Sequence, residues 1–343
     1  MIFITNLKSS INIEFNKDYC ITSVHKGNFM SYLIPEWEKQ KYIQLVLPHK
    51  DTDWNCCLKE VLKTFREIAY NIAKFEKVLI CYQNPNSLKS FKHKNFIFKK
   101  IKNNDTWARD FGAISIKKDN KVQLLDFIFN GWGLKFPSNY DNQISKKIFK
   151  NLKSYNFVLE GGSIDTNGEV LLTNTKCLLE KNRNYPMTKK AISNFLKRTL
   201  KVKKIIWLNY GFLDGDDTDS HIDTLARFVN KNTIVYMKCY DKKDIHYYEL
   251  NKMEEELKKT KFNLIPLPLP MPIFYKGKRL PATYVNFLII NGAVLLPIYN
   301  CKYDNKVIKI FKKIFPNKNI IPINSNTLIK QHGSIHCITK EYF

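Results

Sequence analysis

The sequence has few arginines for a chain so rich in positive charge. It has 343 residues and a formal net charge of +25, yet only six of its 56 basic residues are arginine. Arginine is the side chain that reads bases and clamps phosphates with a planar fork. The lysines are spread over the whole chain and do not gather in one basic stretch. The charge therefore does not by itself indicate a nucleic-acid-binding protein, although that class stays open as an alternative.

Cysteine motifs and long apolar runs are also missing. The eight cysteines include no Cys-x-x-Cys pair, fit no zinc spacing and do not resemble a small disulfide framework, so a reducing compartment is expected. The start, MIFITNLKSSINIEF, has no sustained apolar core, which argues against a signal peptide. No window approaches the roughly 18 apolar residues of a membrane span. We therefore expect a cytoplasmic protein that has no contact with a membrane.

The composition is that of a globular protein, with 44% hydrophobic and 25% charged residues. No Gly/Ser-rich linker or low-complexity tract divides the chain. We therefore predict a single domain over residues 31–343. An N-terminal extension of uncertain role, residues 1–30, precedes it.

A degenerate repeat of helix, short apolar strand and hairpin runs along the chain. Helices are predicted, from apolar residues at three- and four-residue spacing, near residues 57–75, 141–153, 188–201, 246–259 and 303–315. The short apolar strands that follow them are 78–82, 157–159, 204–208, 262–267 and 319–323. The strand–turn–strand segments are 108–127, 161–173, 220–238, 283–298 and 333–339. The repeat predicts an α/β fold.

The last hairpin segment lacks room for a return strand, because the chain ends at Phe343. Residues 42–47 could supply that strand and close a ring of five units. Turn residues such as Asn167-Gly168 and Asn291-Gly292 separate the strands of two hairpins. Five units around an axis would bring all the hairpin starts to one central place. An open α/β sheet with unrelated hairpins is the alternative.

Residues with useful chemistry stand at the hairpin starts. They are Trp107, Arg109 and Asp110, then Glu160, then Asp216, Asp217, His221 and Asp223, and finally His336 and Cys337. Each is ordinary alone, since a lone cysteine is usually a small buried hydrophobe and a lone histidine is usually structural. Only their joint arrangement at equivalent repeat positions indicates an active site displayed on loops.

The third hairpin start is strongly acidic for so basic a chain. Four aspartates lie between residues 216 and 223, and His221 and Asp223 are two residues apart, as on one face of a strand. Such a cluster suggests a cationic ligand held in an acidic well. Metal binding is the rival interpretation. The sequence contains neither His-x-x-x-His nor His-Glu-x-x-His, and the acids fit no EF-hand loop, so we expect no metal.

Six ordered segments resemble one family. They are PEWEKQKYIQLVLPHKDTDW (35–54), NDTWARDFGAI (104–114), FNGWGLKFP (129–137), LEGGSIDTNGEVLLTNTKCLL (159–179), GDDTDSHIDTLARF (215–228) and GSIHCIT (333–339). Together they are similar to the agmatine deiminases of the guanidino-modifying pentein superfamily, from about residue 31 to the C-terminus. The resemblance implies a pentein α/β propeller of five pseudo-repeated helix–strand–hairpin units around a central active site, in agreement with the repeat.

The resemblance also implies roles for five residues. Cys337 would be the covalent nucleophile and His221 the proton shuttle. Glu160 would pair with His221 and keep it oriented and protonated. Asp110 and Asp223 would grip the substrate guanidinium, because a group that stays charged at any physiological pH needs carboxylates in a desolvated site.

Trp107 would line the substrate slot. Two positions depart from the family pattern. The first is Asp217, which stands where the family often has a substrate-contacting glutamate one methylene longer. The family often has a glycine triplet before the Cys337 stretch, where this chain has Gln331-His332-Gly333. His332 therefore inherits no family role.

The implied activity is hydrolysis of agmatine to N-carbamoylputrescine and ammonia through an amidino-cysteine intermediate. Such a hydrolase of linear amidines needs no cofactor. A homo-oligomer, dimer or larger, is expected from relatives. Deimination of arginine or peptidyl-arginine stays an alternative; free arginine would need a cation, such as Arg109 or a nearby lysine, facing its α-carboxylate. A non-catalytic nucleic-acid-binding protein is the other alternative.

Overall fold

The computed structural model describes residues 31–343, and helices and strands alternate along this part of the chain. The predicted N-terminal extension, residues 1–30, lies outside the described residues. The helices are α1 Leu58–Ala73, α2 Ala108–Phe111, α3 Gly131–Leu134, α4 Ile144–Ile148, α5 Thr175–Leu178, α6 Lys181–Asn184, α7 Lys189–Leu200, α8 Tyr247–Lys258 and α9 Asp304–Ile314. Short 3₁₀ turns include η1 Asp53–Cys57, η4 Gly161–Ser163, η5 Ile222–Thr224 and η6 Leu328–Gln331.

The strands of the described residues are short and form sheets of two to four strands. They are β1 Tyr32–Leu33, β2 Tyr42–Val46, β3 Lys77–Tyr82, β4 Phe96–Lys100, β5 Ile114–Lys118, β6 Lys121–Ile128, β7 Leu152–Val158, β8 Ile164–Thr166, β9 Val170–Asn174, β10 Lys204–Leu208, β11 Ala226–Asn230, β12 Thr233–Lys238, β13 Asn263–Pro268, β14 Phe274–Tyr275, β15 Lys278–Arg279, β16 Leu288–Ile290, β17 Ala293–Ile298, β18 Asn319–Asn324 and β19 Thr339–Tyr342.

The larger sheets repeat one pairing pattern. The two strands of a hairpin pair antiparallel, as β5 with β6, β8 with β9, β11 with β12 and β16 with β17. The second strand then pairs parallel with the strand that follows the next helix, as β6 with β7, β9 with β10, β12 with β13 and β17 with β18. A parallel pair needs a crossover, which the intervening helices supply. This order confirms the predicted helix–strand–hairpin repeat.

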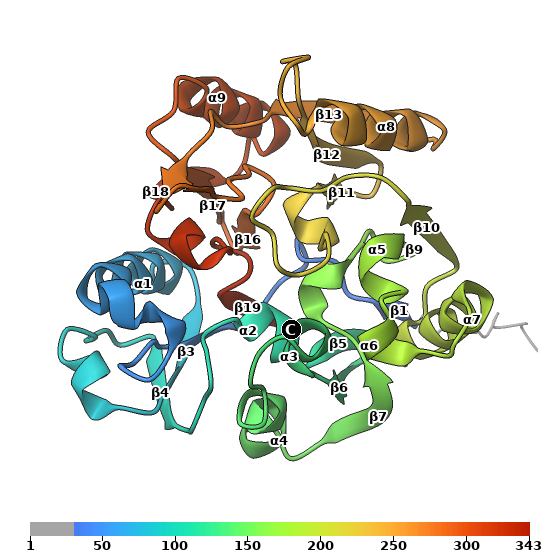
Figure 1. Cartoon of the computed structure of the whole chain (residues 1–343). Coiled ribbons are helices and arrows are strands. Elements are labelled where there is room, and N and C mark those ends of the chain that lie inside the picture. The colour runs from blue at the N-terminus through green and yellow to red at the C-terminus, as the bar shows by residue number, and fades with distance from the viewer. Residues whose placement is uncertain (1–30) are drawn as a thin grey trace, which may run out of the picture.

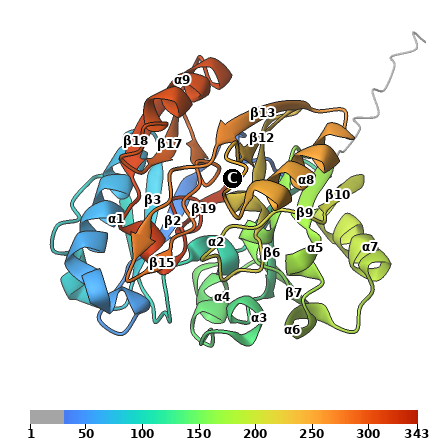
Figure 2. The same ribbon diagram turned by 45° about the horizontal axis from the view of Figure 1, so that its top comes forward.

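The last sheet joins the two ends of the described chain. Strand β19 pairs antiparallel with β2, and β2 pairs parallel with β3. The prediction that residues 42–47 supply the missing return strand is therefore confirmed. Figure 1 shows the strand groups following one another around the middle of the molecule, with helices such as α1, α7, α8 and α9 toward its outside. In the turned view of Figure 2, α1, α7 and α9 again lie at the outside.

Four of the five predicted helices match long helices, and the fifth prediction was wrong in its length. Helix α4 ends at Ile148, where Phe149 takes an extended conformation, and β7 begins at Leu152. The predicted helix over 141–153 therefore includes the start of a strand. Pairing with β6 satisfies the backbone of residues 152–158 in place of a longer helix.

The helices pack their apolar faces against the sheets. In α1 the buried side chains Val61, Phe65, Ile68 and Ile72 recur at three- and four-residue spacing, which places them on one face. They belong to a core cluster that also contains β2 and β3 residues such as Ile43. Burial of these apolar stripes fixes the strands whose ends carry the polar loops. Among residues 31–343, no helix is long and apolar enough to cross a membrane.

The closing strand β2 offers a test of the core. Ile43 of β2 is fully buried, whereas Ile97 of β4, in the same sheet, is 43% exposed. We expect Ile43→Ala to lower the free energy of unfolding by about 2–5 kcal/mol, because it leaves a cavity in a packed core. Ile97→Ala, the matched control, should lower the free energy of unfolding by under about 1 kcal/mol, because this side chain is already partly exposed. Urea unfolding followed by circular dichroism measures both, and equal losses would contradict the described packing.

Candidate active site

A pocket lies where several of the polar loops meet. Its walls come from η1, from α2 and the segment before it, from the loop around α3, from residues 216–224 and from residues 331–337, which lead into β19. The lining residues are Asp53, Asp105, Trp107, Asp110, Trp132, Phe136, Asp216, Asp217, Thr218, His221, Thr224, Gln331, His332, Gly333 and Cys337. The structure therefore brings together five of the predicted site residues, Trp107, Asp110, Asp217, His221 and Cys337, in one cavity.

The charge of this lining is one-sided. Five aspartates line the pocket, and no lysine or arginine of residues 31–343 is among the lining residues, although the chain is strongly basic. Burial, and then the neighbouring charge of Asp53, raise the pKa of Asp105 to about 7. Burial also raises the pKa of Asp217 to about 6; His332 opposes this shift and Asp216 adds to it. Crowded, desolvated carboxylates of this kind favour a cationic ligand, which would neutralise them.

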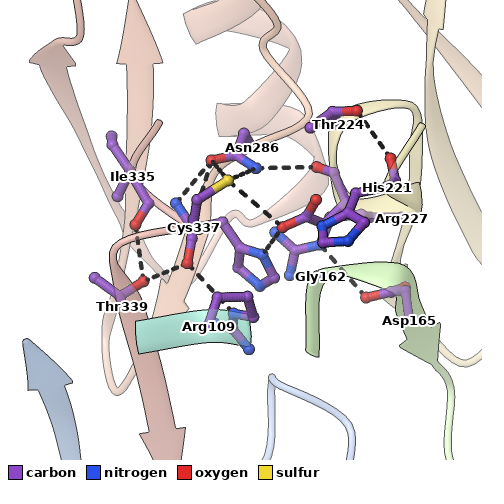
Figure 3. Close-up of polar contacts among 12 residues, drawn as sticks. Arg109, Gly162, Asp165, His221, Thr224, Arg227, Asn286, Ile335, Cys337 and Thr339 are labelled. Atoms are coloured by element: carbon purple, nitrogen blue, oxygen red, sulfur yellow. Dashed lines mark hydrogen bonds and ion pairs between the residues drawn. The ribbon is translucent and has the colours of Figure 1, made fainter. Parts of the chain in front are cut away.

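Cys337 lies on the floor of the pocket and is only 7% exposed. The side-chain amide of Asn286 donates a hydrogen bond to its Sγ at 3.1 Å, and Figure 3 shows this amide lying against the sulfur. Oδ2 of Asp223 is 3.9 Å from the sulfur. Burial and the charges of Asp223 and Asp110 raise the pKa of the thiol well above its usual value. These surroundings therefore favour the thiol over the thiolate.

His221 is buried between two carboxylates. Its Nδ1 lies 3.6 Å from Oδ1 of Asp110, and its Nε2 lies 3.8 Å from Oε2 of Glu160. Burial alone would lower the pKa of the imidazole, but the Asp110 charge and further groups that include Glu160 hold it well above its ordinary value. Nε2 has no hydrogen-bond partner among residues 31–343. The two carboxylates therefore favour the protonated ring.

Glu160 contacts a second cation, Arg183, which the sequence analysis did not identify. The Nε of Arg183 lies 3.0 Å from each carboxylate oxygen of Glu160. Burial would raise the pKa of Glu160, but His221 and Arg183 outweigh it and lower this pKa to about 2. Glu160 is thus an anion between two cations. The expected Glu160–His221 pairing is a 3.8 Å ion pair, supported from behind by Arg183.

Among residues 31–343, the ligand atoms of Glu160, Cys177 and His221 lie within 4.8 Å of one another, as a metal site would require. The donor set does not suit a cation. Both carboxylate oxygens already receive the Arg183 guanidinium, whose positive charge would repel a metal ion at this place.

Asp110 is fixed in the pocket by two donors. The indole N–H of Trp132 donates to its Oδ2 and the backbone N–H of Gly162 donates to its Oδ1, both at 2.9 Å. Gly162 stands where no side chain fits. A Cβ there would lie 2.6 Å from Nδ1 of His221 and 2.8 Å from Oδ1 of Asp110. Glycine is therefore required for the close approach of these groups.

Asp223 is positioned from below by a buried histidine. Nδ1 of His336 is 2.7 Å from Oδ2 of Asp223, and Nε2 of His336 is 2.7 Å from Oε2 of Glu36. Oε2 of Glu36 also accepts a hydrogen bond of 2.7 Å from Arg227. Oδ1 of Asp223 is buried and has no hydrogen-bond partner among the described residues. One oxygen of this predicted guanidinium-binding group is thus held, and the other is left to accept.

Arg109 does not serve as the cation expected for an arginine α-carboxylate. It is buried outside the pocket lining, where it forms an ion pair of 2.5 Å with Glu341 and lies 3.6 Å from Glu36. Its Nε also donates to the backbone carbonyl of His336 at 3.3 Å. The side chain is a structural cation beneath the site, and that part of the alternative was wrong.

The acidic segment 216–223 contributes less free negative charge than its composition predicted. Asp219 pairs with Arg183 and Lys135, each at 2.7 Å. Asp216 accepts hydrogen bonds from Thr218 and Ser220 within its own loop. Much of the negative charge at the pocket comes instead from segments that lie far away in the sequence.

The segment that leads to Cys337 passes close to the ring of Trp107 at Gly333. A Cβ on Gly333 would lie 2.1 Å from the Trp107 ring, so glycine is needed where the chain passes the indole. His332 has a positive φ of 68°, a conformation that glycine adopts more readily. Its Nδ1 lies 2.5 Å from the carbonyl of Gly215. The departure from glycine at this position therefore adds a contact between two walls of the pocket.

Sequence reasoning missed several residues that hold the site. Trp132, Arg183, Asn286 and Glu36 contact predicted site residues through distant parts of the chain. Trp132 lies within a segment that carried the resemblance, and Glu36 lies in another. The resemblance thus covers both residues, but no pattern in the neighbouring sequence indicates which residues they contact.

Comparisons with known proteins show which families the chain resembles. A family model described as Porphyromonas-type peptidyl-arginine deiminase matches residues 32–342. The agmatine deiminase of Medicago truncatula is 30% identical over 89% of this chain and 94% of its own length. A cysteine-to-serine variant of the C. jejuni agmatine deiminase with substrate bound superposes with a TM-score of 0.90 at 44% identity, covering 97% of this chain and 99% of that one.

A more distant likeness concerns the fold alone. The DDAH of Pseudomonas aeruginosa superposes with a TM-score of 0.52 at 12% identity, covering 89% of this chain and all of that one. Together with the nearer matches, it confirms the predicted mixed α/β fold of the pentein type.

The environment of His221 predicts its titration. Asp110→Asn removes a negative charge 3.6 Å from the ring, so the pKa of His221 should fall by roughly one to three pH units. Nuclear magnetic resonance titration of ¹⁵N-labelled histidine measures this. Asp119→Asn, in the exposed turn between β5 and β6, is the matched control and should leave the His221 pKa unchanged. An unchanged pKa in the Asp110 variant would show that its charge does not act on the ring.

Proposed function

Because the chain belongs to the Porphyromonas-type peptidyl-arginine deiminase family, we propose that it is an agmatine deiminase. The reaction is hydrolysis of the agmatine guanidinium to N-carbamoylputrescine and ammonia. The named relatives at 30% and 44% identity are agmatine deiminases, and they are covered almost from end to end. Agmatine is a small dication at neutral pH, with a guanidinium at one end and an amine at the other.

The observation that carries this choice is the charge of the pocket. Five aspartates line it, and the lining residues of the described chain include no lysine or arginine. Free arginine would bring an α-carboxylate among these carboxylates without a cation to receive it. The two positive ends of agmatine match the lining. We assign the guanidinium to the inner end, at Asp110 and Asp223, and the amine to the outer end.

The proposed first half-reaction begins with the guanidinium held by these two carboxylates. They would keep its central carbon near Sγ of Cys337, which attacks as the thiolate. The carbon becomes tetrahedral, and protonated His221 gives its proton to one terminal nitrogen. The C–N bond breaks and ammonia leaves, so that an amidino group remains on the sulfur.

In the second half-reaction, neutral His221 takes a proton from a water molecule that attacks the same carbon. The C–S bond then breaks, Cys337 leaves as the thiolate, and the new hydroxyl group gives its proton to the released ammonia or to solvent. N-carbamoylputrescine is released with His221 protonated again. Glu160 would act through His221, because its negative charge favours the imidazolium at the start of the cycle.

The raised pKa of the Cys337 thiol supports a mechanism in which the substrate itself assists deprotonation. Burial and the charges of Asp223 and Asp110 oppose a thiolate. A bound guanidinium would neutralise both carboxylates and place a positive charge beside the sulfur. The thiolate would then form mainly when substrate is present.

We interpret the repeated sheets as the five units of a pentein propeller, built as one catalytic domain over residues 31–343. The cysteines of this range are all free, which supports a reducing, cytoplasmic location. Assembly as a homo-oligomer stays a prediction from relatives. The proposal involves no metal, cofactor, membrane or nucleic acid.

The substrate and the nucleophile are tested together. We expect ammonia release from agmatine, with far less from arginine or blocked peptidyl-arginine. Cys337→Ser should lower kcat by at least about 10³-fold, because the weakly acidic hydroxyl replaces the thiolate. Cys301→Ser, at a half-buried cysteine outside the pocket lining, is the matched control and should keep full activity. Turnover of peptidyl-arginine alone would contradict the proposed substrate. Activity in the Cys337→Ser variant would contradict the assignment of Cys337 as the nucleophile.

The outer end of the pocket offers a second test. Asp53 is an exposed lining residue, and we assign it to the distal amine. Asp53→Asn should raise KM for agmatine roughly two- to fivefold, the size of one exposed ion pair, and leave KM for n-butylguanidine unchanged. Asp51→Asn is the control two residues away, with a side chain 61% exposed and outside the lining. Equal effects on both substrates would place the amine elsewhere.

A further inference from the structure

Two adjacent cysteines stand beside the rim of the pocket. Cys56 is exposed, Cys57 is half-buried, and both belong to η1, the same turn as the lining residue Asp53. Their sulfur atoms lie 2.9 Å apart. None of the steps proposed for the reaction uses them. Two thiols so close together, one of them open to solvent, form a ready dithiol.

The dithiol is connected to the pocket by hydrogen bonds. Nε2 of Gln331 donates to the backbone carbonyl of Asp53 at 2.6 Å and to Sγ of Cys56 at 3.6 Å. The Cys56 thiol itself contacts the Asp53 carbonyl at 3.8 Å. Gln331 and Asp53 both line the pocket, and Gln331 directly precedes His332 and Gly333 of the lining. A change at Cys56 would therefore reach two walls of the site.

We propose that Cys56 and Cys57 are a site of reversible oxidation to a vicinal disulfide, which weakens substrate binding at the rim. The effect on substrate rests on the proposed function; the modification itself does not. The oxidant is a hydroperoxide. The exposed Cys56 thiolate attacks the peroxide oxygen, the O–O bond breaks and a sulfenic acid forms with release of one water or alcohol. The Cys57 sulfur then attacks the Cys56 sulfur, the S–O bond breaks, and a second molecule, water, leaves.

The geometry favours a reversible bond. Neighbouring Cα atoms are about 3.8 Å apart, below the usual range for disulfides, so the ring is strained and easily reduced. Strained, exposed disulfides are the labile ones that respond to redox conditions. Closing the bond draws the two sulfur atoms together and removes the Cys56 thiol proton. Both changes disturb the contacts of Cys56 with Gln331 and with the Asp53 carbonyl.

The experiment separates the modification from its effect. Full-length Cys337→Ser protein is used, so that oxidation of the nucleophile cannot contribute. After treatment with hydrogen peroxide, we expect the peptide containing residues 56 and 57 to lose the mass of two hydrogen atoms and to resist alkylation. Dithiothreitol should reverse both changes. The same treatment should give no such loss in a Cys56→Ser, Cys337→Ser double variant.

The effect on the pocket is read by calorimetric titration with agmatine. We expect oxidation to raise Kd roughly three- to tenfold, the size of one disturbed hydrogen bond. The Cys56→Ser double variant should show no such rise, and a Cys301→Ser, Cys337→Ser double variant should respond like Cys337→Ser alone. Free, alkylatable thiols after peroxide treatment, or oxidation to sulfinic acid, would overturn the site. A disulfide without a change in Kd would overturn its link to the pocket.

A failure of the proposed function leaves a different signature. In that case the reduced protein would neither bind agmatine nor, with Cys337 intact, turn it over. The mass and alkylation measurements would still decide whether Cys56 and Cys57 form the disulfide.

Discussion

The structure depends on the pairing of buried charges. Glu36, which precedes the first long strand, lies beneath the site and is 2.7 Å from both Arg227 and His336, with Arg109 at 3.6 Å. Taking such groups out of water is costly unless each finds a partner of opposite charge with good geometry. The partners come from segments nearly 200 and 300 residues away. Satisfying Glu36 therefore requires the early, middle and late parts of the chain to meet at one place.

This requirement also orders the groups that would do chemistry. Asp223 is held through one oxygen by His336, and its other oxygen is left without a partner among the described residues. His221 is likewise held between the carboxylates of Asp110 and Glu160, and its Nε2 makes no hydrogen bond among residues 31–343. The fold thus leaves one buried acceptor and one buried donor without hydrogen bonds among the described residues, at positions fixed in advance by their neighbours. Asp53, at the exposed rim of the pocket, makes no ion pair among the described residues and has fewer such constraints.

Much of the fold could be predicted because its units are local. Short apolar strands, amphipathic helices and Asn-Gly turns are each readable within a dozen residues, and the repeat supplied their order. The return strand at 42–47 followed from the lack of space after Cys337. The helix predicted over 141–153 was too long, because its apolar spacing does not show that residues 152–158 can pair with β6.

The sequence by itself determined which polar residues stand at hairpin starts, and so placed Cys337 and His221 among the candidates for one site. Only the tertiary structure decided their partners. Arg183 behind Glu160 and Asn286 against the sulfur carry no local pattern, since each is an ordinary residue whose role depends on a contact. Local patterns reflect the burial of neighbouring residues. A charge, a pKa or an unused hydrogen-bonding group depends on residues that only the folded chain brings within a few ångströms.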